Sequence, residues 1–184
     1  MRIVYTRDVY TLAAVTIVII ALGIVYLSMR RKLKRSEPHF SAEAQRAIGF
    51  ARVEAERLRS SSIDAAHLLL GLMHVPDPAI LEVLPLESHE PIRKEIIDHS
   101  GGAALVSYRD DLPFSDEARQ VLVSAAREAR ALGAAEINAE HLLLGVLHAE
   151  SSVGALVLRE RGLRLNTLRE QLALTPEYSG EAQT

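Results

Sequence analysis

The sequence predicts an all-α protein in which one N-terminal transmembrane helix precedes a domain built from two copies of a four-helix unit. The first observation behind this prediction is that residues 9–29 contain no charged side chain. The second is an internal repeat: residues 40–74 align without a gap to residues 114–148, with 16 of 35 positions identical. Composition agrees, because alanine and leucine dominate and aromatic residues make up only 4%, which favours helices over strands.

After a short N-terminal tail (residues 1–8), residues 9–29 are predicted to cross a membrane. At about 1.5 Å per residue, a helix of this length reaches roughly 31 Å, close to the hydrocarbon thickness of about 30 Å. Tyr10 and Tyr26 lie near its ends, where aromatic rings with a polar tip favour the membrane interface. A cleaved signal peptide is the alternative, but no small-residue cleavage site follows, and the apolar segment ends in a basic cluster.

The basic cluster lies in a juxtamembrane linker, residues 30–39, and predicts the orientation of the chain. Its positive charges are Arg30, Arg31, Lys32, Lys34 and Arg35. Before the apolar segment, the positive charges are Arg2 and Arg7. Because basic residues favour the cytoplasmic side, we expect a single-pass protein of the inner cell membrane with a cytoplasmic C-terminal domain. Residues 9–35 are then expected to contact lipid.

The remainder of the chain is acidic and lacks cysteine. Residues 36–184 contain 14 basic and 23 acidic side chains, a net charge of −9. A surface of this sign repels phosphate backbones, so we expect no nucleic-acid partner. The lack of cysteine excludes disulfides and thiolate metal sites.

Each copy of the repeat is predicted to form four helices. Repeat 1 covers residues 40–98 and repeat 2 covers residues 114–173, with a connector at 99–113 and a flexible tail at 174–184. Their first helices are expected to end near Arg59 and Leu132, and their fourth helices to lie near 91–98 and 166–172. The residues expected to start or stop helices are Ser41, Asp64, Asp77, Pro78, Ser115, Gly133, Asn138 and Ser152.

The histidines of the repeat do not predict a metal site. His67 and His74 are seven residues apart, as are His141 and His148. On a helix, this spacing separates two side chains by about 10 Å, too far to share one ion at bonds of roughly 2.1 Å. We therefore expect hydrogen-bonding histidines, with no metal and no cofactor. The sequence also lacks a nucleophile elbow and a phosphate loop, so we expect no enzyme activity.

The repeat motifs resemble those of the Clp N-terminal domain family, also called the Clp repeat domain. Each copy opens with Phe-Ser-x-Glu-Ala, at Phe40 and Phe114, and continues with Ile-x-x-x-His-Leu-Leu-Leu-Gly, at Ile63 and Ile137. Over residues 40–173, the resemblance implies two four-helix repeats related by a pseudo-twofold axis. It also implies the substrate- and adaptor-docking module of ClpC/ClpA-type unfoldases, here without ATPase modules.

For some relatives of the ClpC type, the resemblance implies sites for phosphorylated arginine. These sites use a hydroxyl residue at the start of the first helix and the glutamate directly before the motif histidine. The matching residues are Ser115 and Glu140 in repeat 2, and Ser41 and Ala66 in repeat 1, where the carboxylate is missing. The alternative is that Ser115 is only an N-cap and Glu140 only an acid in a first helical turn.

These observations predict a membrane-tethered protein-interaction module. The expected partner is a degradation substrate, an adaptor or a component of a Clp-type protease, and the expected docking surface is the groove between the repeats. The alternative, from a different class, is a structural or assembly protein that self-associates at the membrane.

Overall fold

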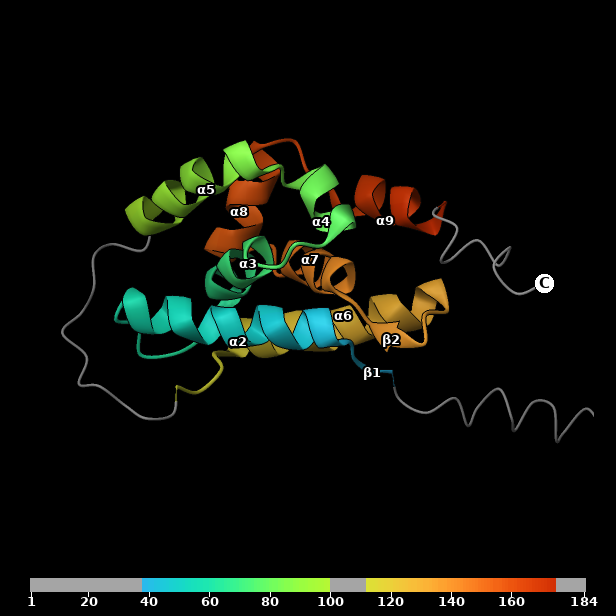
Figure 1. The fold of residues 1–184 in the computed structure, drawn as a ribbon, viewed down its shortest axis with the longest axis horizontal. Coiled ribbons are helices and arrows are strands. Elements are labelled where there is room, and N and C mark those ends of the chain that lie inside the picture. The colour runs from blue at the N-terminus through green and yellow to red at the C-terminus, as the bar shows by residue number, and fades with distance from the viewer. Residues whose placement is uncertain (1–37, 100–111, 175–184) are drawn as a thin grey trace, which may run out of the picture. The chain divides into compact units, whose positions relative to one another are not determined.

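Helices dominate the part of the chain that the computed structural model describes, residues 38–99 and 112–174 (Figure 1). Repeat 1 contains β1 (His39–Phe40), α2 (Ala42–Arg57), α3 (Ala65–Met73), α4 (Pro78–Val83) and α5 (Leu86–His99). Repeat 2 contains α6 (Asp116–Leu132), β2 (Glu136–Ile137), α7 (Ala139–His148), α8 (Val153–Glu160) and α9 (Leu165–Ala173). Within these ranges, the eight helices confirm the all-α class.

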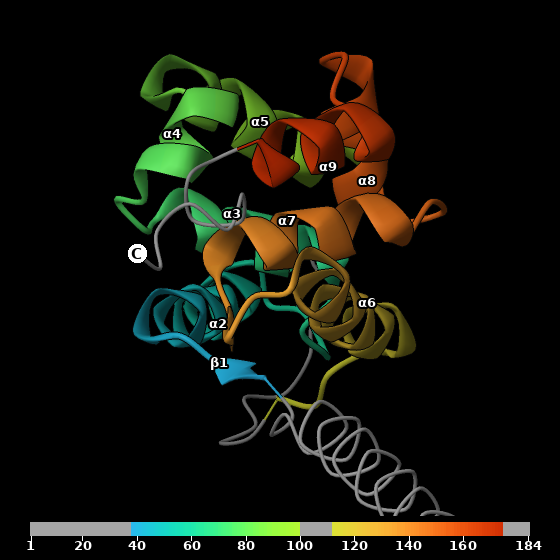
Figure 2. The same cartoon turned by 90° about the vertical axis from the view of Figure 1, so that its right-hand side faces the viewer.

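The helices form three layers. In Figure 2, α2 and α6 form the lowest layer, α3 and α7 the middle layer, and α4, α5, α8 and α9 the top layer. Every residue of α3 is buried, as are nine of the ten residues of α7. A helix that is apolar on all sides needs neighbours on every face. The two Leu-Leu-Leu-Gly motifs therefore form one core that both repeats share.

Gly71 and Gly145 allow the middle layer to approach the lowest layer closely. A β-carbon on Gly71 would lie 2.2 Å from the carbonyl oxygen of Ala47, and one on Gly145 would lie 2.4 Å from that of Val121. The atoms in the way belong to the backbone of another helix, so a larger residue would push two helices apart. This close contact explains why the core motif ends in glycine in both copies.

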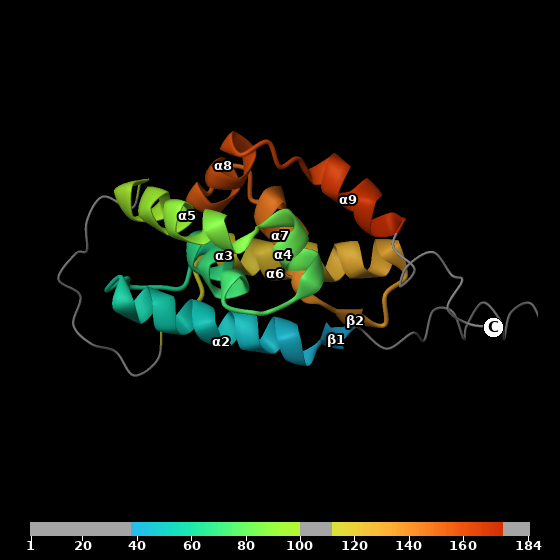
Figure 3. The same ribbon diagram turned by 45° about the horizontal axis from the view of Figure 1, so that its top comes forward.

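Each repeat pairs its first residues with the other repeat. β1 is parallel to β2, and Phe40 lies opposite Ile137. In the other direction, Ile63 forms a parallel bridge with Phe114. Position 40 is equivalent to 114 and position 63 to 137, so the same contact is made reciprocally, as a twofold relation between the copies produces. Figure 3 shows β1 and β2 side by side next to the start of α2.

The predicted helix starts are largely confirmed. The side chains that accept a hydrogen bond from a backbone N–H of the first turn are those of Ser41, Asp64, Asp77, Ser115 and Ser152. Asn138 occupies the N-cap of α7, as expected. Gly133 ends α6 in the left-handed conformation, with a φ of 74°.

The first helix of repeat 1 ends at Arg57, close to the expected Arg59, whose φ is 51°. The predicted start of the fourth helix of repeat 1 was wrong. α5 begins at Leu86 and contains Pro91, which we had expected to lie at its start. The helix tolerates this proline because the ring removes a single backbone donor, and Glu87, whose carbonyl would have accepted it, is exposed to water. The short strands β1 and β2 were also missed.

No single helix within residues 38–99 and 112–174 is long and apolar enough to cross a membrane, although α7 and α8, bent by 98° at their junction, meet these criteria as a pair. The predicted membrane segment at 9–29 and the cluster at 30–35 lie outside the described residues. Most of the predicted connector and nearly all of the predicted tail lie outside them as well.

Candidate functional site

The pairing of β1 with β2 brings Ser41 of repeat 1 and Glu140 of repeat 2 to the same cleft. The backbone N–H of Ser41 donates to the carbonyl of Ile137 at 3.0 Å, which holds the start of α2 beside the start of α7. The cleft has a volume of about 450 Å³ and is open to solvent. Its lining residues are Ser41, Glu43, Asp77, Pro78, Ala79, Glu136, Asn138 and Glu140. It therefore lies where α2, α4 and α7 begin.

The two predicted residues are held in place before any ligand arrives. Ser41 is 6% exposed, and its Oγ accepts a hydrogen bond from the N–H of Ala44 at 3.2 Å. Glu140 is 5% exposed, and its Oε1 accepts from the Nδ2 of Asn138 at 3.4 Å. A carboxylate withdrawn from water in this way favours a cationic partner.

Four carboxyl groups give the cleft a negative charge. Glu43 and Glu136 are half-buried and form surface ion pairs, with Arg46 at 2.8 Å and His39 at 2.9 Å. Burial is the main cause that raises the pKa of Asp77, and the charges of Glu140 and Glu43 raise it further. The repulsion among these carboxyl groups favours a ligand with a guanidinium or ammonium group.

Ser115 does not share this cleft with Glu140, which corrects the predicted pairing within repeat 2. Ser115 caps the start of α6. Glu140 lies in the first turn of α7, which the chain reaches after the far end of α6. The 17 residues of α6 rise by about 25 Å. The N–H of Ser115 instead donates to the carbonyl of Ile63 at 2.8 Å, at the end of the molecule where α3 begins.

The equivalent position in the other half of the molecule is less acidic. An offset of 74 replaces Glu140 by Ala66, Asp77 by Ser151 and Glu136 by Ser62. Two positions of this half are acidic: Glu117 is equivalent to Glu43, and Asp64 is equivalent to Asn138. Of these two equivalent positions in the described part of the chain, the cleft at Ser41 is the one that combines a capped helix start with the glutamate that the resemblance requires.

Sequence reasoning found Ser41 and Glu140 but assigned them to different sites. It missed the contributions of Glu43, Asp77 and Glu136 to the cleft. The missing information was the pairing between repeats, because a pattern within one repeat cannot show that its first strand crosses to the other copy. The equivalence of Phe40 with Phe114 and of Ile63 with Ile137 was the available signal.

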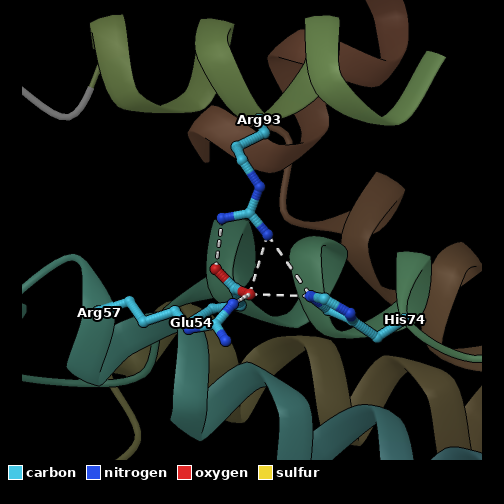
Figure 4. A network of polar contacts seen from close by, with 4 residues as sticks. All are labelled: Glu54, Arg57, His74 and Arg93. Atoms are coloured by element: carbon cyan, nitrogen blue, oxygen red, sulfur yellow. Dashed lines mark hydrogen bonds and ion pairs between the residues drawn. The ribbon is translucent and has the colours of Figure 1, made fainter. Parts of the chain in front are cut away.

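A second polar cluster surrounds Glu54 of α2 (Figure 4). Arg93 donates to Glu54 Oε2 at 2.6 Å and Oε1 at 2.9 Å, and the Nε2 of His74 lies 2.8 Å from Oε1. Arg57 donates to Oε1 at 3.2 Å. Glu54 is fully buried, and the hydrogen bond from Arg93 is the largest effect that lowers its pKa to about 2, against the opposing effect of burial.

Repeat 2 contains the same cluster around Glu128. Arg169 donates to Oε2 of Glu128 at 2.8 Å and to Oε1 at 2.7 Å, and the Nε2 of His148 lies 2.6 Å from Oε1. These contacts, with Arg169 first, lower the pKa of Glu128 to about 2. Each cluster ties the fourth helix of its repeat to the first, so we assign both a structural role.

The histidines are hydrogen-bonded, as expected. His67 Nδ1 accepts from the N–H of Asp64 at 3.1 Å, and His141 Nδ1 accepts from that of Asn138 at 2.9 Å. Both lie in the first turns of the core helices, whereas His74 and His148 belong to the glutamate clusters. Among residues 38–99 and 112–174, no group of histidine, aspartate and glutamate residues is arranged to hold a metal ion.

The sequence of repeat 2 matches a known family. Residues 113–181 match the model of the Clp repeat (R) N-terminal domain. The chain is 33% identical over 136 residues to the negative regulator of genetic competence ClpC/MecB of Bacillus subtilis, an alignment that covers 72% of this chain and 16% of that protein. It is 32% identical over 145 residues to the ATP-dependent Clp protease ATP-binding subunit ClpC of Staphylococcus aureus (75% and 17%). The chain thus spans about a sixth of these relatives.

Solved structures show the same fold. The N-terminal domain of the Clp-associated chaperone ClpD of Arabidopsis thaliana superposes with a TM-score of 0.59 at 25% identity, covering 72% of this chain and 90% of that domain. The N-domain of ClpV of Vibrio cholerae gives a TM-score of 0.58 at 19% identity (79% and 88%).

Fold and sequence are therefore similar to those of one class of domain, the N-terminal domains of Clp chaperones. The described part of this chain has a Clp N-domain-like fold, and about three quarters of the chain aligns with ClpC proteins at about one-third identity.

Proposed function

We propose that this protein is a membrane-tethered docking module that binds a protein partner through the cleft between Ser41 and Glu140. The partner is a degradation substrate, an adaptor or a component of a Clp-type protease. The observation that supports this function most strongly is the acidic cleft beside the capped start of α2. It offers carboxylates to a guanidinium group and backbone N–H donors to an anionic group attached to it.

Phosphoarginine is the natural first ligand, because the resemblance to ClpC-type domains implies it and the cleft contains both required elements. Its guanidinium nitrogens would face Glu140, while its phosphoryl oxygens would face the first turn of α2. Unmodified arginine would keep the first contact and lose the second. The four carboxyl groups of the cleft make this comparison informative, since they oppose the phosphoryl charge.

Calorimetric titration of the full-length chain with phosphoarginine, arginine and phosphate tests this site. We expect phosphoarginine to bind and Glu140→Gln to abolish its binding. Ser41→Ala should weaken binding, whereas Ser115→Ala should not, although both variants lose an equivalent N-cap. Equal effects of the two serine substitutions, or binding that survives Glu140→Gln, would disprove the assignment.

Tethering is the second part of the proposal, with residues 9–29 in the inner cell membrane and the helical domain in the cytoplasm. An anchor would concentrate the partner at the membrane. The absence of cysteine allows a clean test of orientation, because Gly180→Cys introduces a single thiol. In intact cells, a membrane-impermeant maleimide should not label this thiol until the cells are lysed. Labelling before lysis would reverse the orientation, and recovery of the chain in the soluble fraction would exclude the anchor.

A further inference from the structure

One face of α2 carries exposed apolar and cationic side chains that the fold does not require. Phe50 is 39% exposed and Val53 is 41% exposed, and the side chains of Arg46 and Arg57 are 56% and 62% exposed. These four residues, which we call the α2 stripe, follow one another at spacings of four, three and four residues. Such spacing places them on one side of the helix, with the apolar pair between two arginines.

Repeat 2 shows that the fold does not depend on the α2 stripe. The positions of α6 equivalent to the stripe are occupied by Gln120, Ser124, Arg127 and Ala131. The polar cluster beneath is nevertheless complete in both copies, with a glutamate, a histidine and an arginine in each. All four stripe residues therefore differ between two otherwise equivalent helices, which separates them from the residues that stabilise the repeat.

Arg57 is available to a partner although it contacts Glu54 (Figure 4). Arg93 donates to both oxygens of Glu54, at 2.6 and 2.9 Å, and His74 contacts the same carboxylate at 2.8 Å. The contact from Arg57 is the longest of the four, at 3.2 Å. In repeat 2, alanine occupies the position of Arg57 without loss of the cluster. The ring of Phe50 lies beside this polar cluster, 5.0 Å from that of His74.

We propose that the α2 stripe docks an acidic amphipathic helix of a protein partner. The stripe extends about 17 Å, which matches roughly three turns of a helix with apolar residues between two acidic ones. A second copy of this chain does not fit, because pairing two stripes in either direction places arginine against arginine. A membrane surface is also disfavoured, because residues 36–184 carry a net charge of −9 and anionic lipid repels such a domain.

Three further acids lie on α2, and none of them neutralises the stripe. Glu54 contacts Arg57, but its carboxylate is already bound by Arg93 and His74. Glu56 follows Val53 by three positions. This residue lies about 100° round the helix from Arg57. Glu43 pairs with Arg46 at 2.8 Å, but the pair lies at the surface, with 56% of the Arg46 side chain exposed, and surface ion pairs contribute little free energy. The stripe is thus opposite in charge to the cleft at Glu140, so the two surfaces select different segments of a partner.

Fluorescence anisotropy with two synthetic peptides tests this surface. The probe is a 15-residue helical peptide with leucines on one face and glutamates at both ends of that face, and its control carries lysines in place of the glutamates. The target is the full-length chain in phosphatidylcholine nanodiscs, with empty nanodiscs as the blank. We expect the glutamate peptide to bind, and binding to weaken as salt rises.

Variants that remove one stripe side chain at a time provide the decisive comparison. Phe50→Ser should weaken binding about tenfold, as loss of a central aromatic anchor does, and Arg57→Ala about two- to fivefold. Val53→Ser, which removes an exposed apolar side chain without changing the charge and leaves the ring contact of Phe50 intact, should also weaken it. Val123→Ser, at an exposed site on α6, should have no effect.

Three outcomes would overturn the proposal. The first is no binding of the glutamate peptide at millimolar concentration, and the second is equal affinity for the wild type and both Phe50→Ser and Val53→Ser. The third is binding of phosphatidylglycerol vesicles that depends on Phe50, which would assign the stripe to the membrane. Far-UV circular dichroism of each variant confirms that the helices remain folded.

Discussion

Replacing Glu54 with glutamine should destabilise the domain by about 3 kcal/mol at neutral pH. The carboxyl group is buried, and its contacts, chiefly Arg93, lower its pKa from 4.5 to about 2. The free energy linked to this change is about 3 kcal/mol at pH 7, close to the cost of removing one partner of a buried ion pair. Glutamine keeps the shape and one acceptor, so the loss reports the charge rather than a cavity.

The dependence on pH makes this prediction specific. A group with a lowered pKa stabilises the folded state above its unfolded pKa of about 4.5 and loses this effect as pH falls towards 2. The penalty of Glu54→Gln should therefore shrink to about 1 kcal/mol at pH 3. Glu128 contributes equally to both proteins and cancels in the difference.

Urea denaturation of the full-length chain in detergent, followed by far-UV circular dichroism at pH 7 and pH 3, measures both values. Glu56→Gln is the matched control, because Glu56 is an exposed neighbour on the same helix and should change stability by no more than about 0.5 kcal/mol. A penalty below about 1 kcal/mol at pH 7, or one that is the same at both pH values, would refute the reasoning.

Two further predictions concern glycines, and thermal unfolding measures both. Gly71→Ala should lower stability by several kcal/mol, because its β-carbon would lie 2.2 Å from the carbonyl oxygen of Ala47, whereas Gly49→Ala meets nothing within 4 Å and should raise stability by about 1 kcal/mol. A loss at both positions would show that helix contact is not the cause. Gly133→Ala should cost about 1 kcal/mol, because the residue ends α6 with a φ of 74°; an unchanged melting temperature would contradict this.

The helices could be predicted from the sequence because their signals are local. Ser41 and Ser115 cap helices through contacts with residues three positions on, and Gly133 stops one by its own conformation. The internal repeat then predicted that both copies share one arrangement. The error at α5 arose from the same local reasoning, since a proline was expected to mark a start and instead lies within a partly exposed helix.

The candidate site could be predicted only in part because it is not local. Glu140 was recognised by its place before His141, but its neighbour Ser41 lies about 100 residues earlier in the chain. A two-residue strand pairing joins them, and strands this short leave no periodic pattern in the sequence. Asp77 lines the cleft because α4 begins there and packs against α7 of repeat 2. This packing between repeats could not be predicted from local sequence patterns.

The shared core leads to a final prediction, that neither repeat folds alone as a monomer. All nine residues of α3 are buried, and part of their cover comes from repeat 2. A β-carbon on Gly154 of α8 would lie 3.0 Å from the carbonyl oxygen of Ala65, which shows how closely the second repeat packs on α3. Separation would expose several leucines, each contributing about 1.5–3 kcal/mol when buried.

Fragments 38–99 and 112–174 allow this to be measured by circular dichroism and sedimentation. Each should lack a cooperative thermal transition alone, and an equimolar mixture should regain one as a heterodimer. Because the strand contact is reciprocal, a fragment that folds as a homodimer would still agree with the reasoning, since a second copy would then supply the missing pairing. A folded monomer of either fragment would show that the core of one repeat suffices for folding. The strand pairing between the repeats would then position the cleft without being needed for the fold.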